Sequence, residues 1–153
     1  APQNVIDSFY NVTIPNYNRS VKAAMVRVLD DTIGVIIDAI KNKYNLWDDL
    51  LLIWSTDNGG PIYHNEAASN WPLRGGKATL WEGGVRGDGF VTGGYLNKNQ
   101  RGKTSEALMH STDWLPTLCE VTGITPLNKS ILDGMSMLDV IQNDVKSPRT
   151  EIV

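Results

Sequence analysis

The amino-acid sequence predicts an α/β domain with a mainly parallel sheet flanked by helices, and three consecutive segments support this prediction. Between about Ser20 and Tyr44, apolar residues recur at three- and four-residue steps, the period of a helix with one buried face. The run 50–55 is apolar without alternation, which is typical of a strand covered on both faces. It ends at the polar, glycine-rich sequence 56–60, where the ligands of α/β folds gather.

The first helix has a well-marked apolar face and a candidate cap. Ser20 is placed to act as its N-cap. The residues expected on the buried face are Val21, Met25, Val28, Leu29, Ile33, Ile36, Ile40 and Tyr44. Residues 1 to about 18, which contain two prolines, are expected to be irregular.

After the buried strand, glycine, asparagine and proline interrupt every periodicity from Pro61 to Trp81, which predicts a long functional or mobile loop. Residues 85–92 are expected to form a second strand, although Asp88 leaves its start open. A helix is predicted from 111–113 to Gly123, with Asp113 available to cap it. Two short elements follow, a helix at 138–142 and a strand beginning at 151–153.

Composition excludes several classes of protein. A chain of 153 residues with 41% hydrophobic and 20% charged residues is ordinary for one globular domain. The net charge of −3 and the scattered basic residues give no reason to expect nucleic acid or a membrane surface as partner. No segment has the roughly 20 apolar residues that a membrane span needs. Cys119 is the only cysteine, so no disulfide can form within this chain, and an inert buried thiol is expected there.

Three triplets fit the acceptor pattern for N-glycosylation. Their asparagines are Asn11, Asn18 and Asn128. Such triplets also arise by chance in a chain rich in asparagine. Together they favour a lysosomal or secreted, extracellular protein.

The pair Asp57-Asn58 at the end of the buried strand is the first candidate for chemistry. A carboxylate and an amide oxygen are hard ligands suited to Ca²⁺ or Mg²⁺, but calcium takes six to eight oxygens. Two ligands are therefore only part of a site. The alternative is a polar turn that caps the next segment.

Lys77 is the second candidate because it follows two glycines in Arg74-Gly75-Gly76-Lys77. Glycines allow the backbone to approach an anion closely, and the lysine supplies a compact positive charge. The alternative is a surface lysine beside a flexible turn. Glu82 and Arg86 are expected to form an ion pair that braces the loop against the second strand.

The two histidines have different expected roles. His64 lies in the variable part of the long loop, where it is either exposed or lines a substrate pocket. His110 directly precedes a capped helix and is expected to make a structural hydrogen bond rather than to act as an acid or base.

These signals occur in an order that resembles one family. The stretches 55–60, 70–77, 80–87, 110–118 and 132–134, together with the helix 24–34, are similar to sulfatases of the arylsulfatase B, I and J group. The similarity covers nearly the whole chain. It implies an alkaline-phosphatase-like α/β fold and hydrolysis of sulfate esters of a sulfated sugar or aryl sulfate.

The resemblance also implies particular residue roles. Asp57 and Asn58 match the later pair of calcium ligands, and Lys77 matches the late active-site lysine that contacts the sulfate ester. The family nucleophile is a formylglycine made from cysteine in a Cys-x-Pro-x-Arg motif, and Cys119 is not in such a motif. The nucleophile, the early metal-binding aspartates, and the early lysine and histidine are thus expected outside residues 1–153.

Residues 1–153 are therefore expected to be the middle-to-late part of a sulfatase catalytic domain. This piece is expected to be inactive by itself, to need the remainder of the sulfatase chain, and not to be an intact secretory precursor. A second hypothesis is a non-catalytic sulfatase-like component of a larger extracellular assembly. A third is a superfamily relative acting on phosphate esters or phosphonates, against which the stretch 70–77 argues.

Overall fold

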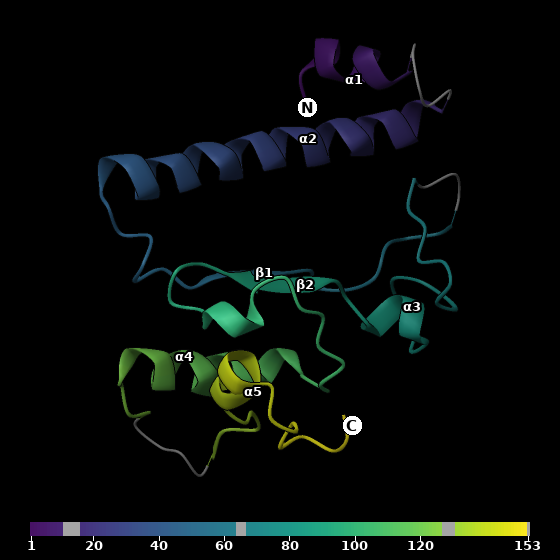
Figure 1. Ribbon diagram of the computed structural model, residues 1–153. Coiled ribbons are helices and arrows are strands. Elements are labelled where there is room, and N and C mark those ends of the chain that lie inside the picture. The colour runs from purple at the N-terminus through teal and green to yellow at the C-terminus, as the bar shows by residue number, and fades with distance from the viewer. Residues whose placement is uncertain (11–15, 64–66, 127–130, 153) are drawn as a thin grey trace. The chain divides into compact units, whose positions relative to one another are not determined.

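The computed structural model describes residues 1–10, 16–63, 67–126 and 131–152 (Figure 1). The chain divides into two compact units. The first unit combines Ala1–Asp48 with Ile53–Phe90. The second combines Asp49–Leu52 with Val91–Val153. Each unit is therefore built from two stretches of chain.

The first unit begins with a helix that the sequence prediction missed. Helix α1, Gln3–Tyr10, packs against α2, Tyr17–Asp38, as Figure 1 shows. The Pro2 carbonyl accepts hydrogen bonds from the backbone N–H groups of Val5 and Ile6. Proline is well tolerated at a helix start because the first N–H groups need no intrahelical partner. Pro2 therefore begins the helix instead of breaking it, and Ile6 is buried.

Helix α2 confirms the long helical prediction but starts one turn earlier than expected. The N-cap is Asn16, whose side chain accepts from the Arg19 N–H at 3.0 Å, so the assignment of Ser20 was wrong. Ser20 is fully buried inside the helix, and its hydroxyl donates to the Asn16 carbonyl at 3.0 Å. The helix continues as a π-helical stretch, η1, Ala39–Lys43.

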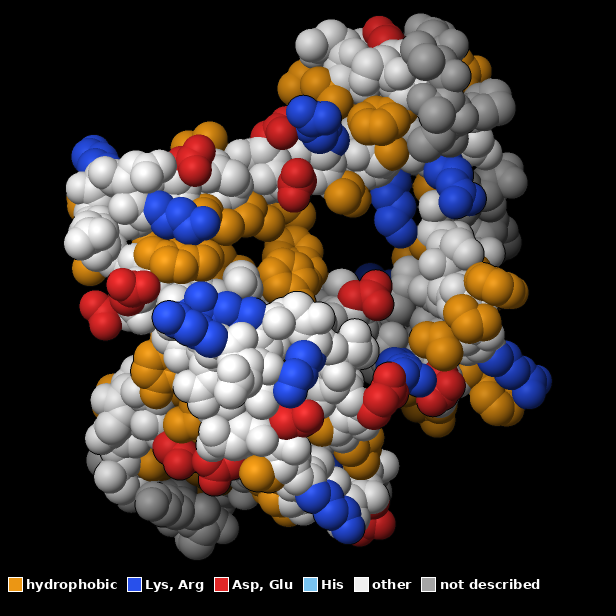
Figure 2. All heavy atoms as spheres, in the orientation of Figure 1, with side chains coloured by type: hydrophobic (Ala, Val, Ile, Leu, Met, Phe, Trp, Pro, Cys, Tyr) orange, Lys and Arg blue, Asp and Glu red, His pale blue; other side chains and the backbone are white. Residues whose placement is uncertain are grey.

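The predicted buried face of α2 is only partly covered. Ala24 is fully buried, whereas the side chains of Met25 and Ile36 are 58% and 51% exposed. Figure 2 shows hydrophobic side chains at the surface along this helix. None of the eight residues predicted for the buried face is buried, and the two buried residues of α2 are Ser20 and Ala24. For the described residues, the helical period therefore predicts the helix correctly but not which side chains are buried.

A two-stranded sheet pairs β1, Leu52–Ser55, with β2, Gly89–Thr92. The Thr56 N–H donates to the Asp88 carbonyl at 3.0 Å, and the Tyr95 N–H donates to the Leu50 carbonyl at 3.1 Å. The partners therefore run in opposite directions, and the pairing is antiparallel. The expected parallel sheet is not seen in the part of the chain that the structure describes.

The faces of this sheet are also less covered than the apolar run predicted. The rings of Trp54 and Phe90 stack with centroids 6.2 Å apart, but Phe90 is 51% exposed. An apolar run without alternation predicts a strand correctly here. It does not predict, for the described residues, cover on both faces.

The long loop is confirmed, because residues 61–63 and 67–81 contain no helix or strand. It ends in a one-turn helix, α3, Glu82–Val85, which occupies the start of the expected second strand. Gly83 and Gly84 are buried there, and a Cβ on Gly83 would overlap the Arg74 and Gly75 carbonyls. This close approach favours a helical turn, so the strand starts only after Asp88.

In the second unit, both predicted helices are confirmed, and the second starts at residue 138 as predicted. The 3₁₀ turn η3, Ser111–Asp113, leads into α4, Trp114–Thr122, which ends at Gly123 with φ of +70°. Helix α5, Leu138–Asn143, packs against α4, and a second 3₁₀ turn, η2, spans Lys98–Gln100.

Three further findings complete the description of this fold. The buried Thr117 hydroxyl accepts from the Met137 N–H at 2.9 Å, which links α4 to the start of α5. Residues 151–152 form no strand, contrary to the prediction. No helix within the described ranges is long and apolar enough to cross a membrane.

Candidate functional site

The turn after β1 presents the predicted metal ligands. One Asp57 carboxylate oxygen, Oδ1, accepts from the Asn58 N–H at 2.8 Å, and the Asn58 Nδ2 donates to the Gly59 carbonyl at 2.8 Å. The Asp57 side chain is exposed and Asn58 is half-buried. With its amide nitrogen held by the Gly59 carbonyl, Asn58 has its Oδ1 oxygen left to act as a ligand.

A second turn, Arg74–Lys77, lies against this first turn. The Lys77 N–H donates to the Gly60 carbonyl at 3.1 Å, so the backbone of Lys77 adjoins the Asp57–Gly60 turn. The Lys77 side chain is exposed, and its ammonium has no carboxylate partner among the described residues. An exposed cation without a carboxylate partner in the described part of the chain is suited to receive an anion.

Asn70 connects the two turns and was not singled out from the sequence. Its Oδ1 accepts from the Gly60 N–H at 2.8 Å, while its Nδ2 donates to the carbonyls of Gly60 and Gly75 at 2.8 and 3.1 Å. A side chain that satisfies backbone groups of both turns fixes their separation. Asparagines are common in loops rich in glycine, so nothing in the sequence distinguishes Asn70 as a functional residue.

Helix α3 supports both turns from one side. The Gly59 N–H donates to the Gly84 carbonyl at 2.9 Å, and the Gly83 N–H donates to the Arg74 carbonyl at 2.8 Å. A Cβ on Gly59 would overlap the Gly83 carbonyl, so this contact requires glycine. Gly59, Gly83 and Gly84 thus serve close backbone packing.

Arg74, in the second turn, carries a second exposed cation. Its guanidinium lies 3.7 Å from the centroid of the Trp81 ring, a cation–π contact. The ion pair predicted between Glu82 and Arg86 is present, with 3.7 Å between Oε1 and Nη1. The pair joins the first residue of α3 to the residue after its end, and both side chains are largely exposed. Whether it braces the loop against β2 stays a prediction.

The donor set fits part of a calcium site. Asp57 and Asn58 provide two hard oxygens on one turn, whereas calcium takes six to eight. Over the described ranges, no cluster of three or more His, Cys, Asp or Glu side chains could hold a metal ion. The remaining ligands of any calcium bound at this turn must come from other groups.

A second polar centre, around Asp113, is structural in character. Asp113 is fully buried and pairs with the Arg149 guanidinium at 2.6 and 2.8 Å. It also accepts from the backbone N–H groups of His110 and Met135 at 2.7 and 2.8 Å. Burial by itself raises the pKa of the Asp113 carboxyl, but these hydrogen bonds and the Arg149 charge outweigh it and hold that pKa below its ordinary value.

His110 confirms its predicted structural role. Its side chain accepts from the Thr112 N–H, and Asp113 accepts from the His110 N–H, so the helix start has a reciprocal capping box. The cap is thus His110, with Asp113 as its partner. His64, Asn11 and Asn128 lie outside the described residues, and Asn18 is an exposed residue in the first turn of α2.

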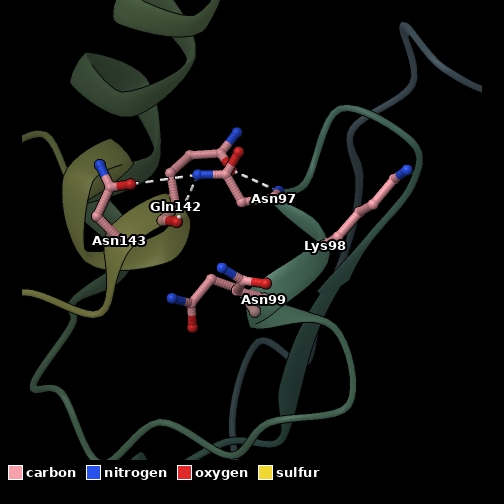
Figure 3. Close-up of a pocket in the computed structure, with 6 residues that line it drawn as sticks. Asn97, Lys98, Asn99, Gln142 and Asn143 are labelled. Carbon is pink, nitrogen blue, oxygen red and sulfur yellow. Dashed lines mark hydrogen bonds between the residues drawn. The ribbon is translucent and has the colours of Figure 1, made fainter.

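Two cavities in the second unit lie outside the predicted site. One, of about 410 Å³, lies between η2 and the end of α5 (Figure 3). The other, of about 560 Å³, is lined in part by Cys119, which is half-buried, and Glu120. Neither includes Asp57, Asn58 or Lys77, which the structure presents on exposed turns.

Comparison with known proteins assigns the class. A family model described as Sulfatase matches residues 1–124, which include both turns and Asp113. The chain therefore belongs to the sulfatase family. This membership carries the alkaline-phosphatase-like α/β fold class, of which the described sheet shows only one antiparallel pair.

Individual relatives agree with this assignment. The chain is 40% identical over 141 residues to Arylsulfatase J of Mus musculus, covering 92% of this chain and 23% of that protein. It is 33% identical to Arylsulfatase A of Homo sapiens, covering 81% and 24%, and 30% identical to a Sulfatase of Formosa agariphila, covering 90% and 26%. The chain thus spans about a quarter of the length of these relatives.

Proposed function

We propose that the protein containing this chain hydrolyses sulfate esters, and that the two joined turns supply its late sulfate-binding lysine and part of a calcium site. The observation that carries the proposal is the contact between Lys77 and Gly60, reinforced by the Asn70 bridge. This contact holds the backbone of Lys77 against the turn that carries Asp57 and Asn58. Relatives named as sulfatases support the same chemistry.

Lys77 would act on the charge that develops during cleavage. Breaking a sulfate ester places negative charge on sulfate oxygens, and a fixed cation stabilises that charge most in a site shielded from water. Lys77 is exposed in this chain. Walls that exclude water must therefore come from the remainder of the protein, as must the formylglycine nucleophile that the resemblance implies.

Asp57 and Asn58 would hold calcium through one carboxylate and one amide oxygen. Bound calcium supplies positive charge that positions a nucleophile and polarises the ester. The residues of this chain orient those oxygens, because the Asp57–Asn58 and Asn58–Gly59 hydrogen bonds restrict the turn.

The substrate class we propose is a sulfated sugar or an aryl sulfate. A relative of Homo sapiens, 28% identical over 76% of this chain, is named N-acetylgalactosamine-6-sulfatase. We also propose a lysosomal or secreted location for the protein, on the basis of its three acceptor triplets for N-glycosylation.

Replacing Lys77 tests the proposed reaction. In the complete protein, Lys77→Ala is expected to lower turnover of a chromogenic aryl sulfate at least about a hundredfold, because a transition-state charge contact worth a few kcal/mol is lost. Lys103→Ala is the matched control. Lys103 is an exposed lysine of the second unit, 4.0 Å from Asp144 of the same unit, whereas Lys77 belongs to the first unit. Near-normal turnover by Lys77→Ala would refute the role. A folded wild-type protein without any sulfatase activity would instead favour the non-catalytic hypothesis.

Replacing Asp57 tests the metal role separately. Asp57→Ala is expected to lower the calcium content of the purified protein, because a charged oxygen ligand is removed. Elemental analysis after gel filtration measures this without any assay of activity. Asp30→Ala, an exposed aspartate of α2, is the control. Calcium content equal to that of the wild type would contradict the assignment.

A further inference from the structure

The cavity between η2 and the end of α5 has an unusually uniform lining. The residues that surround its roughly 410 Å³ are carboxamides and one lysine: Asn97, Lys98, Asn99, Gln100, Gln142 and Asn143. We call this the amide recess (Figure 3). None of its residues belongs to the two turns of the proposed sulfatase site.

The walls of the recess are fixed by hydrogen bonds between segments about 45 positions apart. The Asn97 N–H donates to the Gln142 side chain at 2.7 Å, and the Asn97 Nδ2 donates to the Gln142 carbonyl at 2.8 Å. Asn97 and Asn143 point toward one another in Figure 3, and their side chains are 3.2 Å apart. Gln142 also donates to the Tyr95 carbonyl at 3.0 Å.

The segment that carries Asn97, Lys98, Asn99 and Gln100 is also held by Arg101. The Arg101 guanidinium donates to the carbonyls of Gly94 and Leu96 at 2.9 to 3.1 Å. The recess is thus preformed, which lowers the entropy lost when a ligand binds.

Several polar groups of the lining are unused by the protein. Within the described residues, the Asn99 and Gln100 carboxamides and the Lys98 ammonium have no hydrogen-bond or ion-pair partner. Each carboxamide offers two donors and an acceptor oxygen. Lys98, the only charged residue among those that line the recess, extends away from the Asn97–Asn143 contact in Figure 3.

This combination of groups matches a sugar. Each hydroxyl of a sugar ring both donates and accepts, and neutral carboxamides do the same without requiring a charged ligand. A peptide or lipid ligand would need apolar surface, which the six lining side chains do not supply. A single cation in the lining suits one anionic substituent.

We propose that the amide recess is an oligosaccharide-binding subsite that takes a sugar ring, with a sulfate of the same saccharide at Lys98. This inference goes beyond sulfate ester hydrolysis, because it concerns binding in the second unit and needs no turnover. An oligosaccharide held there would be bound through a sugar residue other than the one whose sulfate ester is hydrolysed.

The test measures binding of two size-defined probes to the complete protein by calorimetry: a chondroitin sulfate oligosaccharide and its desulfated form. Binding is measured in the Lys77→Ala background, so that the catalytic site contributes less. The double variant Asn99→Ala, Gln100→Ala is expected to weaken binding of both probes about tenfold, since two hydrogen-bonding groups are lost. Lys98→Ala is expected to weaken only the sulfated probe, about threefold, and less at high salt.

Lys103→Ala is the matched control and is expected to leave both affinities unchanged, because Lys103 lies near Asp144 and does not line the recess. Unchanged affinity in the double variant overturns the proposal, as does an equal loss in Lys103→Ala. Should the double variant fail to fold, Asn99→Asp replaces it and must weaken the sulfated probe more than the desulfated one. Binding of the probes as predicted, together with no turnover of a chromogenic aryl sulfate by the wild-type protein, would refute the proposed function alone.

Discussion

The two polar centres of this chain differ in whether their charged side chains are buried and paired or exposed. Around Asp113, a buried carboxylate is satisfied by a guanidinium and two backbone N–H groups. Around Lys77, the hydrogen bonds join backbone groups and the Asn70 amide, while the charged side chains of Asp57 and Lys77 stay exposed. A fully satisfied charge stabilises a fold, whereas a free charge on a rigid turn can act on a ligand.

Substitutions at the two centres should therefore have different effects on stability and activity. Changes at Asp113 should lower stability and affect activity only through folding. Changes at Asn70 should alter activity more than stability, because Asn70 positions turns whose charged groups contribute little to the fold.

The largest effect is expected for Asp113→Ala. This change leaves the Arg149 charge and two N–H groups without their partner, which costs about 3 kcal/mol, the lower end of the range for breaking a buried pair. Denaturant unfolding of the complete protein measures the change. Asp30→Ala, at an exposed position, should alter the free energy of unfolding little. Equal stability of the two variants would mean that the Asp113–Arg149 pair is not structural.

A smaller effect, on turnover, is expected for Asn70→Ala. Loss of three hydrogen bonds between the turns should lower kcat about tenfold on a chromogenic aryl sulfate, because Lys77 is then positioned less well. Asn70→Asp keeps the acceptor for the Gly60 N–H but loses both donations, so it should not restore activity.

A role of Asn70 in the fold alone would give a different result. It would lower kcat for Asn70→Ala only in proportion to the fraction unfolded. Poorer positioning of Lys77 should instead lower the kcat of the folded fraction, which is measured by correcting turnover for the unfolded fraction found by denaturant unfolding.

The smallest effect is expected for the dependence of the free energy of unfolding on pH. The folded-state pKa of Asp113 is held below its ordinary value, so ionised Asp113 contributes stability that is present above pH of roughly 3.9. This stability is lost as the pH falls through the folded pKa. Unfolding free energies measured between about pH 5 and 2.5 should decline less steeply in Asp113→Asn than in the wild type. Identical slopes would show that Asp113 is not linked to folding.

Much of the candidate site could be predicted from short-range patterns. The position of Asp57 and Asn58 after a strand, and the position of Lys77 after a glycine pair, were both visible in the sequence. The side-chain convergence of these groups on one cation and one sulfate remains a prediction, supported by the Lys77–Gly60 backbone contact. Asn70 could not be found, because its role depends on how the loop folds around it, which brings backbone groups five and ten positions away to its side chain.

The sequence alone determined the features that depend on local chemistry: the helical period of α2, the glycine that ends α4, the structural role of His110 and the family resemblance. Tertiary structure decided the antiparallel pairing of β1 with β2, the burial of Ser20 and the partnership of Asp113 with Arg149. The Asp113–Arg149 pair, for example, joins residues 36 positions apart. Local propensity and periodicity carry no information about such pairings, because the energy that selects them arises only once the chain has packed.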